Sequence, residues 1–405
     1  MKLVVIVTSV PPVNGYHGNL RRMIDMIKDL KRAGYDVHVS YHHNGLSPLP
    51  ECFPHGVTWY IYIPRRFWSL RKRLWGSVIW WSNHLLNRFG FFINHPLGAW
   101  MDPAYTKYLH ARFAERPPVA VIAEYVWMSG AFKAFPRGCR RLLDTHDVFA
   151  NRKKHNFLNG VPCSTYSLGP LAERKGLNRA EVVLAISHEE LDYFQTLKLR
   201  ATVQLLEPSF AGLPPLSESP PGQNILFVAS DNDANIQAGQ NLLKAWARVD
   251  SADPKRQLHV VGLVCEAIRH HESASNVVFH GPVETLVPHY QNAAVSVVPL
   301  TAGTGMSIKT IESLFHGVPV LSSAVGARGL HEFVDHGIIC YEDRDGLTDA
   351  LTKLLANPEI LANARARLQK RLGEYIARTT AQRAEFFRQI ETSAGSTAEA
   401  APAGA

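Results

Sequence analysis

The stretch TAGTGMSIKTIESLFHGVPVL, residues 301–321, decides the fold of this 405-residue chain. It follows an apolar segment, 295–300, that has the composition of a buried strand. A glycine-bearing turn at 302–305 leads into a helical pattern, which Gly317 and Pro319 end as a second apolar strand begins. A strand, a turn, a helix and a strand at this spacing predict one βαβ unit of a parallel sheet.

The turn of this unit suits an anion, because free backbone N–H groups and the positive end of the helix dipole meet there. Glycine also lets a phosphate approach the backbone closely. Lys309 and Glu312 are three residues apart and therefore share a helix face. We expect the turn amides and Lys309 to bind a diphosphate, and Glu312 to accept hydrogen bonds from ribose hydroxyls. The alternative is an ordinary βα turn in a Rossmann-like domain.

The same alternation of strands and helices occurs before and after a proline-rich segment. Residues 208–222 hold five prolines and two glycines, which predicts a linker. The chain is too long for one ordinary core, so we expect two α/β domains with parallel sheets, 1–210 and 223–375. The opening strand and turn lack a G-x-G-x-x-G fingerprint, which argues against NAD-dependent chemistry. Further strands are expected at 3–7, 37–39, 119–124, 141–144, 182–187, 225–228, 258–262 and 277–281.

The 301–321 stretch resembles the donor-site signature of GT-B glycosyltransferases, in particular the retaining family-4-type enzymes (glycosyl transferases group 1) of bacterial polysaccharide biosynthesis. The matching residues are Gly303, Gly305, Lys309, Glu312, Gly317, Pro319 and Val320. Thr304 departs from the pattern, because the family often has a glutamate there. The resemblance implies a GT-B fold, in which two Rossmann-like domains with parallel sheets face a central cleft. It also implies a final helix that crosses back to the first domain, for which we predict residues 376–392.

The resemblance implies sugar transfer from a UDP- or GDP-sugar, without any metal or other cofactor and with retention of configuration. Helix N-termini and cations stabilise the departing diphosphate in such a reaction. The family's usual arginine and lysine are missing from the loop 230–235. Arg328 is a candidate to supply the positive charge instead, and the favoured alternative is that Arg328 is a solvated surface arginine. Asp231-Asn232-Asp233 has the D-x-D pattern of another glycosyltransferase fold, but GT-B-like surroundings argue against a metal there. The donor-binding prediction on this side comprises Gly303, Thr304, Gly305, Met306, Lys309, Glu312 and Arg328.

The first domain is expected to supply the rest of the site. His146, in Asp144-Thr145-His146-Asp147, resembles the family's His-Asp element, and by that resemblance it contacts a donor hydroxyl. The alternative for His146 is a strand-end histidine satisfied by the backbone. Asp147 and Glu124 are carboxylates at strand ends that we expect to orient an acceptor hydroxyl, and either is the general base if the enzyme inverts. The family's glycine loop near the diphosphate is matched by Gly15, His17 and Gly18.

The segment 52–101 has an unusual composition. It contains no Asp or Glu, six arginines and lysines, and six of the eight tryptophans. Basic residues beside large aromatic residues favour an anionic membrane surface, with contact through residues 59–100. The alternatives are a helical insertion packed on its domain and, less favoured, a nucleic-acid patch, which lacks any accompanying motif.

The remaining composition argues for a cytoplasmic protein. Five scattered cysteines without C-x-x-C spacing indicate reduced thiols. No window reaches the ~18–20 apolar residues of a membrane span, and the beginning of the chain has no signal-peptide pattern. Residues 393–405, rich in Ala, Gly, Ser and Thr, predict a disordered tail.

Together these features predict a glycosyltransferase on the inner face of the plasma membrane that modifies a lipid-linked glycan. Two other functions stay open. One is a nucleotide-sugar 2-epimerase on the same fold, which needs neither an acceptor nor a membrane patch. The other is a non-catalytic scaffold, which the substitution at Thr304 and the missing Arg/Lys pair would permit.

Overall fold

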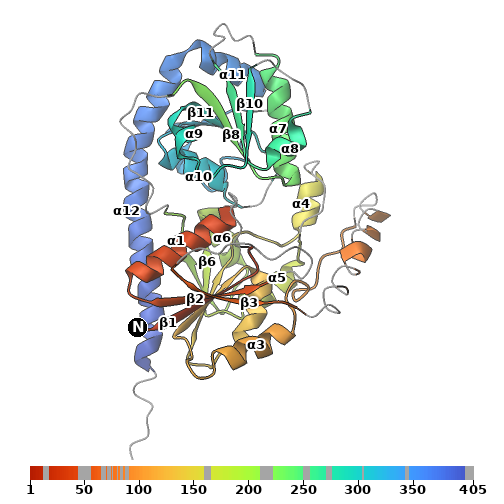
Figure 1. Cartoon of the computed structure of the whole chain (residues 1–405), viewed down its shortest axis with the longest axis vertical. Coiled ribbons are helices and arrows are strands. Elements are labelled where there is room, and N and C mark those ends of the chain that lie inside the picture. Colours follow the sequence, from red (N-terminus) through yellow and green to blue (C-terminus); the bar gives the residue numbers. More distant parts are fainter. Residues whose placement is uncertain are drawn as a thin grey trace, which may run out of the picture.

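A computed structural model describes the chain in two α/β domains, joined by a long final helix (Figure 1). The described residues are 1–11, 18–43, 56–64, 91–158, 166–209, 222–249, 256–270, 276–302, 305–342 and 346–396, with scattered positions between 70 and 86. The predicted linker lies mostly outside these residues.

The first domain is a parallel sheet of seven strands in the order β3-β2-β1-β4-β5-β6-β7. The order reverses beside β1, where a parallel sheet brings loops from both directions together at the carboxyl ends of its strands. The strands are β1 (Leu3–Thr8), β2 (Asp36–His42), β3 (Thr58–Tyr62), β4 (Ala120–Glu124), β5 (Arg140–Asp144), β6 (Val182–Ala185) and β7 (Thr202–Leu205).

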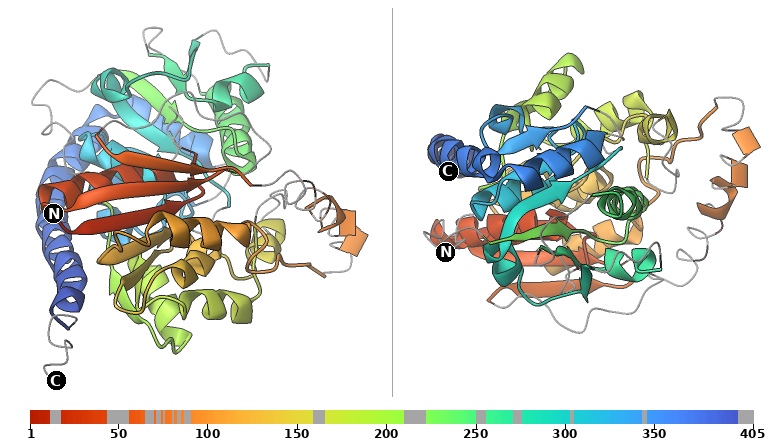
Figure 2. Two further views of the ribbon diagram at one scale, coloured as in Figure 1. Left: turned by 60° about the horizontal axis from the view of Figure 1, so that its bottom comes forward. Right: turned by 90° about the horizontal axis from the view of Figure 1, so that it is seen from above.

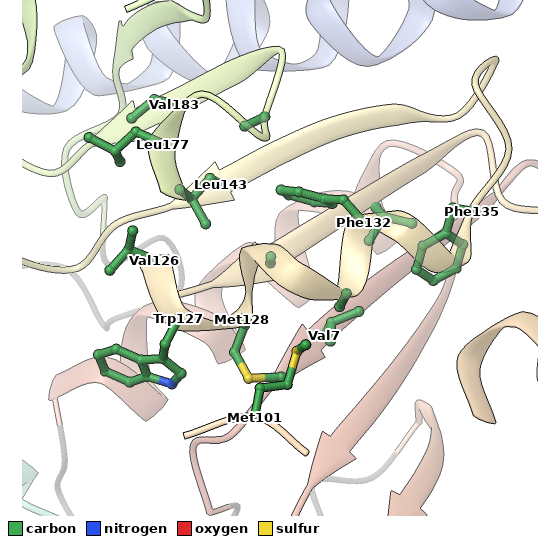
Figure 3. Packing of buried hydrophobic residues seen from close by; sticks show 14 of the residues in the cluster. Val7, Met101, Val126, Trp127, Met128, Phe132, Phe135, Leu143, Leu177 and Val183 are labelled. Carbon is green, nitrogen blue, oxygen red and sulfur yellow. The ribbon is translucent and has the colours of Figure 1, made fainter. Parts of the chain in front are cut away.

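Helices cover both faces of this sheet, so its strands are apolar on both sides. In β1, Val4 and Ile6 pack toward α1 and the end of the final helix, whereas Val5 and Val7 pack toward the opposite layer. Figure 3 shows this second layer, in which Met101, Trp127 and Phe132 fill the space beneath the sheet. The helical elements are α1 (Gly18–Arg32), α3 (Ala104–Arg112), the 3₁₀ helix η2 (Val126–Ala134), α4 (Arg152–Leu158), α5 (Pro170–Leu177) and α6 (His188–Thr196).

The second domain repeats the plan with six parallel strands in the order β10-β9-β8-β11-β12-β13. The predicted βαβ unit is β11, α10 and β12. The strands are β8 (Asn224–Val228), β9 (Leu258–Val261), β10 (Val277–Gly281), β11 (Ala293–Val298), β12 (Val320–Ser322) and β13 (Ile338–Cys340). The helical elements are α7 (Asp233–Trp246), α8 (Val264–Ile268), α9 (Val287–Gln291), α10 (Ile308–Phe315), the 3₁₀ helix η3 (His331–Phe333), α11 (Gly346–Ala356) and α12 (Pro358–Ser396).

Helix α12 runs along both domains (Figures 1 and 2). Its first half packs Leu372 and Tyr375 into the core of the second domain, and its second half packs Phe386 into the core of the first. Between them, Arg378 forms ion pairs with Glu207 of the first domain and Glu332 of the second. The crossing segment predicted at 376–392 is therefore the second half of a longer helix, which continues into the first residues of the predicted tail.

Candidate active site

Helix α10, which contains Lys309 and Glu312 of the predicted nucleotide-sugar site, faces the region between the domains. Its Lys309 ammonium donates to Oδ1 of Asn235 on α7. Burial lowers the pKa of Lys309 to about 8. Glu312, one turn further, is only 9% exposed. Burial raises the pKa of Glu312 to about 7, while Arg21 on α1 acts against that rise.

Glu312 therefore lies where three elements meet. Arg21 and Asp25 of the first domain both act on its charge, and Tyr290 of α9 interacts with its side chain. The ring of Tyr290 is itself stacked on His316, with ring centroids 4.4 Å apart. The carboxyl is thus held at the boundary of the two domains and is not enclosed in purely apolar packing.

The start of α7 forms the other wall beside Lys309. Asn232 caps this helix by accepting a hydrogen bond from the backbone N–H of Asn235 at 2.9 Å. Asn235 also donates to Ser230 at 2.9 Å. Asn235 is a candidate from sequence for the cap of this helix, but the cap is Asn232, and the Asn235 side chain instead links the loop 230–235 to Lys309. The middle residue of the D-x-D pattern, Asn232, is a helix cap.

A buried polar cluster occupies the carboxyl ends of β4 and β5 in the first domain. The Arg22 guanidinium donates to both oxygens of Asp144 at 2.7–3.0 Å and to the carbonyl oxygen of Leu206 at 2.8 Å. His146 Nε2 contacts Glu124, and the His146 ring stacks on Tyr125 with centroids 4.5 Å apart. Glu124 and Asp144 are fully buried.

The charges in this cluster depend on one another. Burial opposes charge on His146, but attraction to Glu124 and Asp144 outweighs it and raises the histidine pKa. Burial likewise opposes charge on Asp144, and Arg22 more than compensates, so the pKa of Asp144 is lowered. Burial raises the pKa of Glu124. The cluster therefore favours an ionised Asp144 beside a cationic Arg22, with a proton held between Glu124 and His146.

The backbone at two of these positions is in the left-handed region. The φ angles are 72° at Tyr125 and 58° at His146. Such angles are uncommon for residues other than glycine, and they cluster at functional sites. Tyr125 directly follows the end of β4, His146 lies two residues after the end of β5, and their rings stack on one another.

The turn before α10 touches this cluster across the domain boundary. A Cβ atom added to Gly305 would lie 3.2 Å from the Asp147 carboxyl carbon and 3.2 Å from the His146 carbonyl oxygen. A side chain at 305 would therefore require these neighbours in the first domain to shift by a few tenths of an ångström. Met306 is close to Gly329, which in turn donates its N–H to Glu189 of α6 at 3.2 Å. The structure thus brings Gly305, Met306, His146 and Asp147 together.

A pocket of about 460 Å³ opens beside this junction. Arg328 contributes from the second domain, and Lys154, His155, Leu158, Glu189 and Glu190 contribute from the first. Burial raises the pKa of Glu190 to about 8. Within the described part of the chain, the Glu190 Oε1 atom has no hydrogen-bond partner. An unpaired buried oxygen at a pocket wall is a position where a ligand hydroxyl can bind.

The predicted residues are thus distributed over two places. Lys309 and Glu312 lie with α7, α9 and α1, whereas Arg328 lines the pocket. Gly18 is the first residue of α1. Gly15, His17, Gly303 and Thr304 lie outside the described residues. Sequence reasoning missed Arg22, Tyr125, Tyr290 and Glu190, because the position of each depends on groups that are distant in sequence.

Glu124, Asp144 and His146 also lie close enough together to resemble a set of metal ligands. The Arg22 guanidinium already occupies both oxygens of Asp144, however, and Glu124 contacts His146 directly. The donor set is therefore satisfied by protein groups and does not fit a resident metal well. The absence of a metal from the reaction stays a prediction.

Comparison with known proteins bears on the fold and on the family of the second domain. Residues 222–357, most of the second domain, match the family described as Glycosyl transferases group 1. No curated protein matches the sequence. Solved structures, by contrast, match over nearly the whole chain.

Sucrose-phosphate synthase from Thermosynechococcus elongatus is 17% identical, with a TM-score of 0.68 over 97% of this chain and 100% of its own. The E. coli trehalose-6-phosphate structure bound with UDP-2-fluoro glucose is 14% identical, with a TM-score of 0.61 over 96% and 98%. The lipopolysaccharide outer core galactosyltransferase WaaB is 13% identical, with a TM-score of 0.56 over 97% and 99%. These likenesses show the GT-B fold, which confirms the predicted fold class. With the family match, they identify a GT-B glycosyltransferase that resembles the group 1 enzymes.

The membrane prediction rests on a segment that the structure describes only in part. At the described positions between 70 and 86 the chain is helical, and Leu70, Leu74, Val78, Trp81 and Leu85 are all exposed. Residues spaced by three and four lie on one helix face. Figures 1 and 2 show this segment at the side of the molecule, apart from both sheets. Among the described residues, no helix combines the length and hydropathy that a membrane span needs.

Proposed function

We propose that this glycosyltransferase transfers a sugar from a UDP- or GDP-sugar to a lipid-linked glycan, with retention of configuration and without a metal ion. The observation on which the proposal rests is the junction of Gly305 with His146 and Asp147, beside Lys309 and Glu312. A donor bound along α10 would have its diphosphate near the turn and its sugar at this junction.

The donor contacts follow from the chemistry of each group. The Glu312 carboxyl suits the vicinal hydroxyls of a ribose, since an ionised carboxylate accepts several hydrogen bonds. Lys309 and the N-terminus of α7 both place positive charge beside Asn235. This charge would stabilise a diphosphate bound there. The similar E. coli structure contains UDP-2-fluoro glucose, which supports a nucleotide-sugar donor.

Retention fits the positions of the carboxylates. An inverting enzyme needs a base that reaches the acceptor hydroxyl. Glu124 is fully buried against His146, and Asp147 is paired with Arg152 at 3.0 Å, so neither is presented to an acceptor. In the proposed step, the bond from the anomeric carbon to the diphosphate oxygen breaks. The acceptor oxygen then bonds to that carbon on the same face, and its proton passes to the departing diphosphate.

His146 would assist by contacting the donor sugar. Its Nε2 faces Glu124, so a contact with a donor hydroxyl would fall to Nδ1. Glu124 is then a positioning residue, which holds the imidazole in place and favours its charged form. The stacked ring of Tyr125 fixes the plane of the imidazole.

The acceptor would enter through the pocket. Lys154 and Arg328 suit a phosphate, and the buried Glu190 oxygen suits an acceptor hydroxyl. Because burial raises the pKa of Glu190 to about 8, this carboxyl is mostly protonated near pH 7 and does not supply the base that inversion needs. Leu158 lines the pocket and is exposed, and its neighbour Phe157 packs on Phe92 with ring centroids 5.4 Å apart. The pocket rim thus continues into apolar surface, as the lipid part of a membrane-bound acceptor requires.

A donor screen tests the reaction. Each of several UDP- and GDP-sugars is incubated with the protein and an acceptor extract, and released nucleoside diphosphate and product are measured. We expect one donor to be consumed, and Glu312→Ala and Lys309→Ala to lower its turnover. Lys353→Ala and Glu359→Ala, exposed changes in the same half of the chain, serve as controls. Wild-type turnover in both site variants, or a changed sugar without nucleotide release, would contradict the proposal.

Vesicle binding tests the location. We expect co-sedimentation with anionic phosphatidylglycerol vesicles that weakens as salt rises, because the basic residues of 52–101 act through a screened field. The double change Leu74→Ser and Trp81→Ser should weaken it further. Leu171→Ser, at an exposed leucine on α5, is the matched control. Vesicle binding that does not depend on lipid charge, on salt or on Leu74 and Trp81 would contradict the membrane contact and favour an insertion packed on its domain.

A further inference from the structure

Three histidines meet at the edge of the second domain's sheet, on elements that the candidate active site does not use. His259 is in β9, His280 is in the edge strand β10, and His289 is in α9. One ring nitrogen from each lies within 4.8 Å of the other two. The rings of His259 and His280 have centroids 4.9 Å apart, and those of His280 and His289 are 4.6 Å apart.

The spacing of two of these nitrogens is close to that of a zinc tripod. Zn–N bonds of about 2.0–2.1 Å in a tetrahedral site place neighbouring nitrogens about 3.3 Å apart. Nε2 of His280 and Nδ1 of His259 are 3.1 Å apart. A small rotation of the His289 side chain would complete the set, since it is on a short surface helix.

A glutamine orients the first of these ligands. Nε2 of His259 lies 3.3 Å from Oε1 of Gln257, an oxygen that can only accept. With the proton of His259 on Nε2, facing Gln257, the lone pair of Nδ1 points toward His280. Metal-bound histidines commonly donate their other ring N–H to such a partner, which fixes the tautomer.

The surroundings favour a borderline divalent metal. Three imidazoles without a carboxylate suit zinc, copper or nickel better than magnesium or calcium. His280 is exposed, which gives an ion a path from solvent.

We propose that His259, His280 and His289 bind one Zn²⁺, with water in the fourth position and Gln257 as the positioning residue. The ion pins α9 to the edge of the sheet. Because α9 also contains Tyr290, which interacts with Glu312, the ion supports one wall of the candidate donor site without entering it.

Calorimetric titration with ZnCl₂ tests the proposal on protein that has no histidine tag and has been treated with a chelator. We expect one ion per chain and a rise in the thermal midpoint on adding zinc, because a ligand that binds only the folded state stabilises it. Gln257→Ala should weaken zinc binding about 10- to 100-fold, as is usual for a partner of a metal-bound histidine. His280→Ala and His289→Ala should remove both the binding and the thermal shift.

His270→Ala is the matched control, because His270 is an exposed histidine at the end of α8 in the same domain. It should bind zinc as the wild type does. Circular dichroism and the metal-free thermal midpoint establish that each variant is folded. Wild-type protein that binds no zinc, or zinc binding that persists in the folded His280→Ala and His289→Ala variants, would overturn the proposal. Neither result depends on sugar transfer, so the proposed function is tested separately.

Discussion

Replacing Glu312 by Gln separates what this residue costs in stability from what it does in binding. Burial raises the pKa of its carboxyl from 4.5 to about 7. At 1.36 kcal/mol for each pH unit, the ionised form costs the folded protein about 3 kcal/mol relative to the unfolded chain. The amide removes this cost and keeps nearly the same shape.

The sign of the pH dependence follows from the two pKa values. Below pH 4.5 the carboxyl is protonated in both states and costs nothing. Between pH 4.5 and 7 only the unfolded chain ionises there, so the contribution of Glu312 to stability falls as the pH rises. Above pH 7 the full cost applies. The stability of Glu312→Gln minus that of the wild type should therefore grow by about 3 kcal/mol between pH 4.5 and 8.

Urea unfolding of both proteins across this pH range measures that difference, and titrations common to both proteins cancel in it. Binding of UDP and GDP, followed by calorimetry, should weaken in Glu312→Gln, because a charged acceptor for the ribose hydroxyls is lost. Glu359→Gln on the surface of α12 is the control for both assays. A difference in unfolding free energy between Glu312→Gln and the wild type that does not change with pH would refute the buried position of the Glu312 carboxyl. Unchanged nucleotide affinity would refute the role in ribose binding.

Three other changes test the rest of the arrangement. Arg22→Met leaves the Asp144 carboxylate buried without its cation, and we expect a loss of about 3–5 kcal/mol in urea unfolding; a loss below 1 kcal/mol would mean that the cluster is hydrated. His146→Asn should lower kcat by about 10- to 150-fold, the value of one hydrogen bond to a charged group, with little change in nucleotide affinity; equal kcat would exclude contact with the sugar. Arg378→Met breaks the link between Glu207 and Glu332, and because Arg378 is about one-third exposed we expect only about 1–3 kcal/mol. Faster proteolysis between the domains should accompany that loss, and unchanged proteolysis would show that α12 packing alone holds them.

Local sequence pattern was sufficient for most of the fold. The apolar runs of β1, β4 and β6 are buried on both faces, and a continuous run of this kind predicts a parallel sheet without ambiguity about which face is inside. The βαβ unit around α10 was predictable for the same reason, since glycine, proline and helical periodicity mark its boundaries. The 3₁₀ helix η2 was not, because its residues are nearly all buried and apolar and show no helical periodicity.

The candidate site was predictable only where a motif is contiguous. Lys309 and Glu312 share a helix face in any α-helix, so the sequence alone places them together. Arg22 and Asp144 are 122 residues apart, and their ion pair depends on how α1 packs against β5. The contact of Gly305 with His146 depends on the distance between two domains, which one sequence without homologues does not define.

The account depends most on a nucleotide diphosphate binding along α10 between the domains. A crystal structure of the protein with UDP or GDP, whichever binds more tightly, measures this directly. We predict the ribose hydroxyls within hydrogen-bond distance of the Glu312 carboxylate and the diphosphate beside Lys309 and the Gly305 turn. A nucleotide bound elsewhere, with Glu312 and Lys309 unchanged and remote from it, would contradict the account.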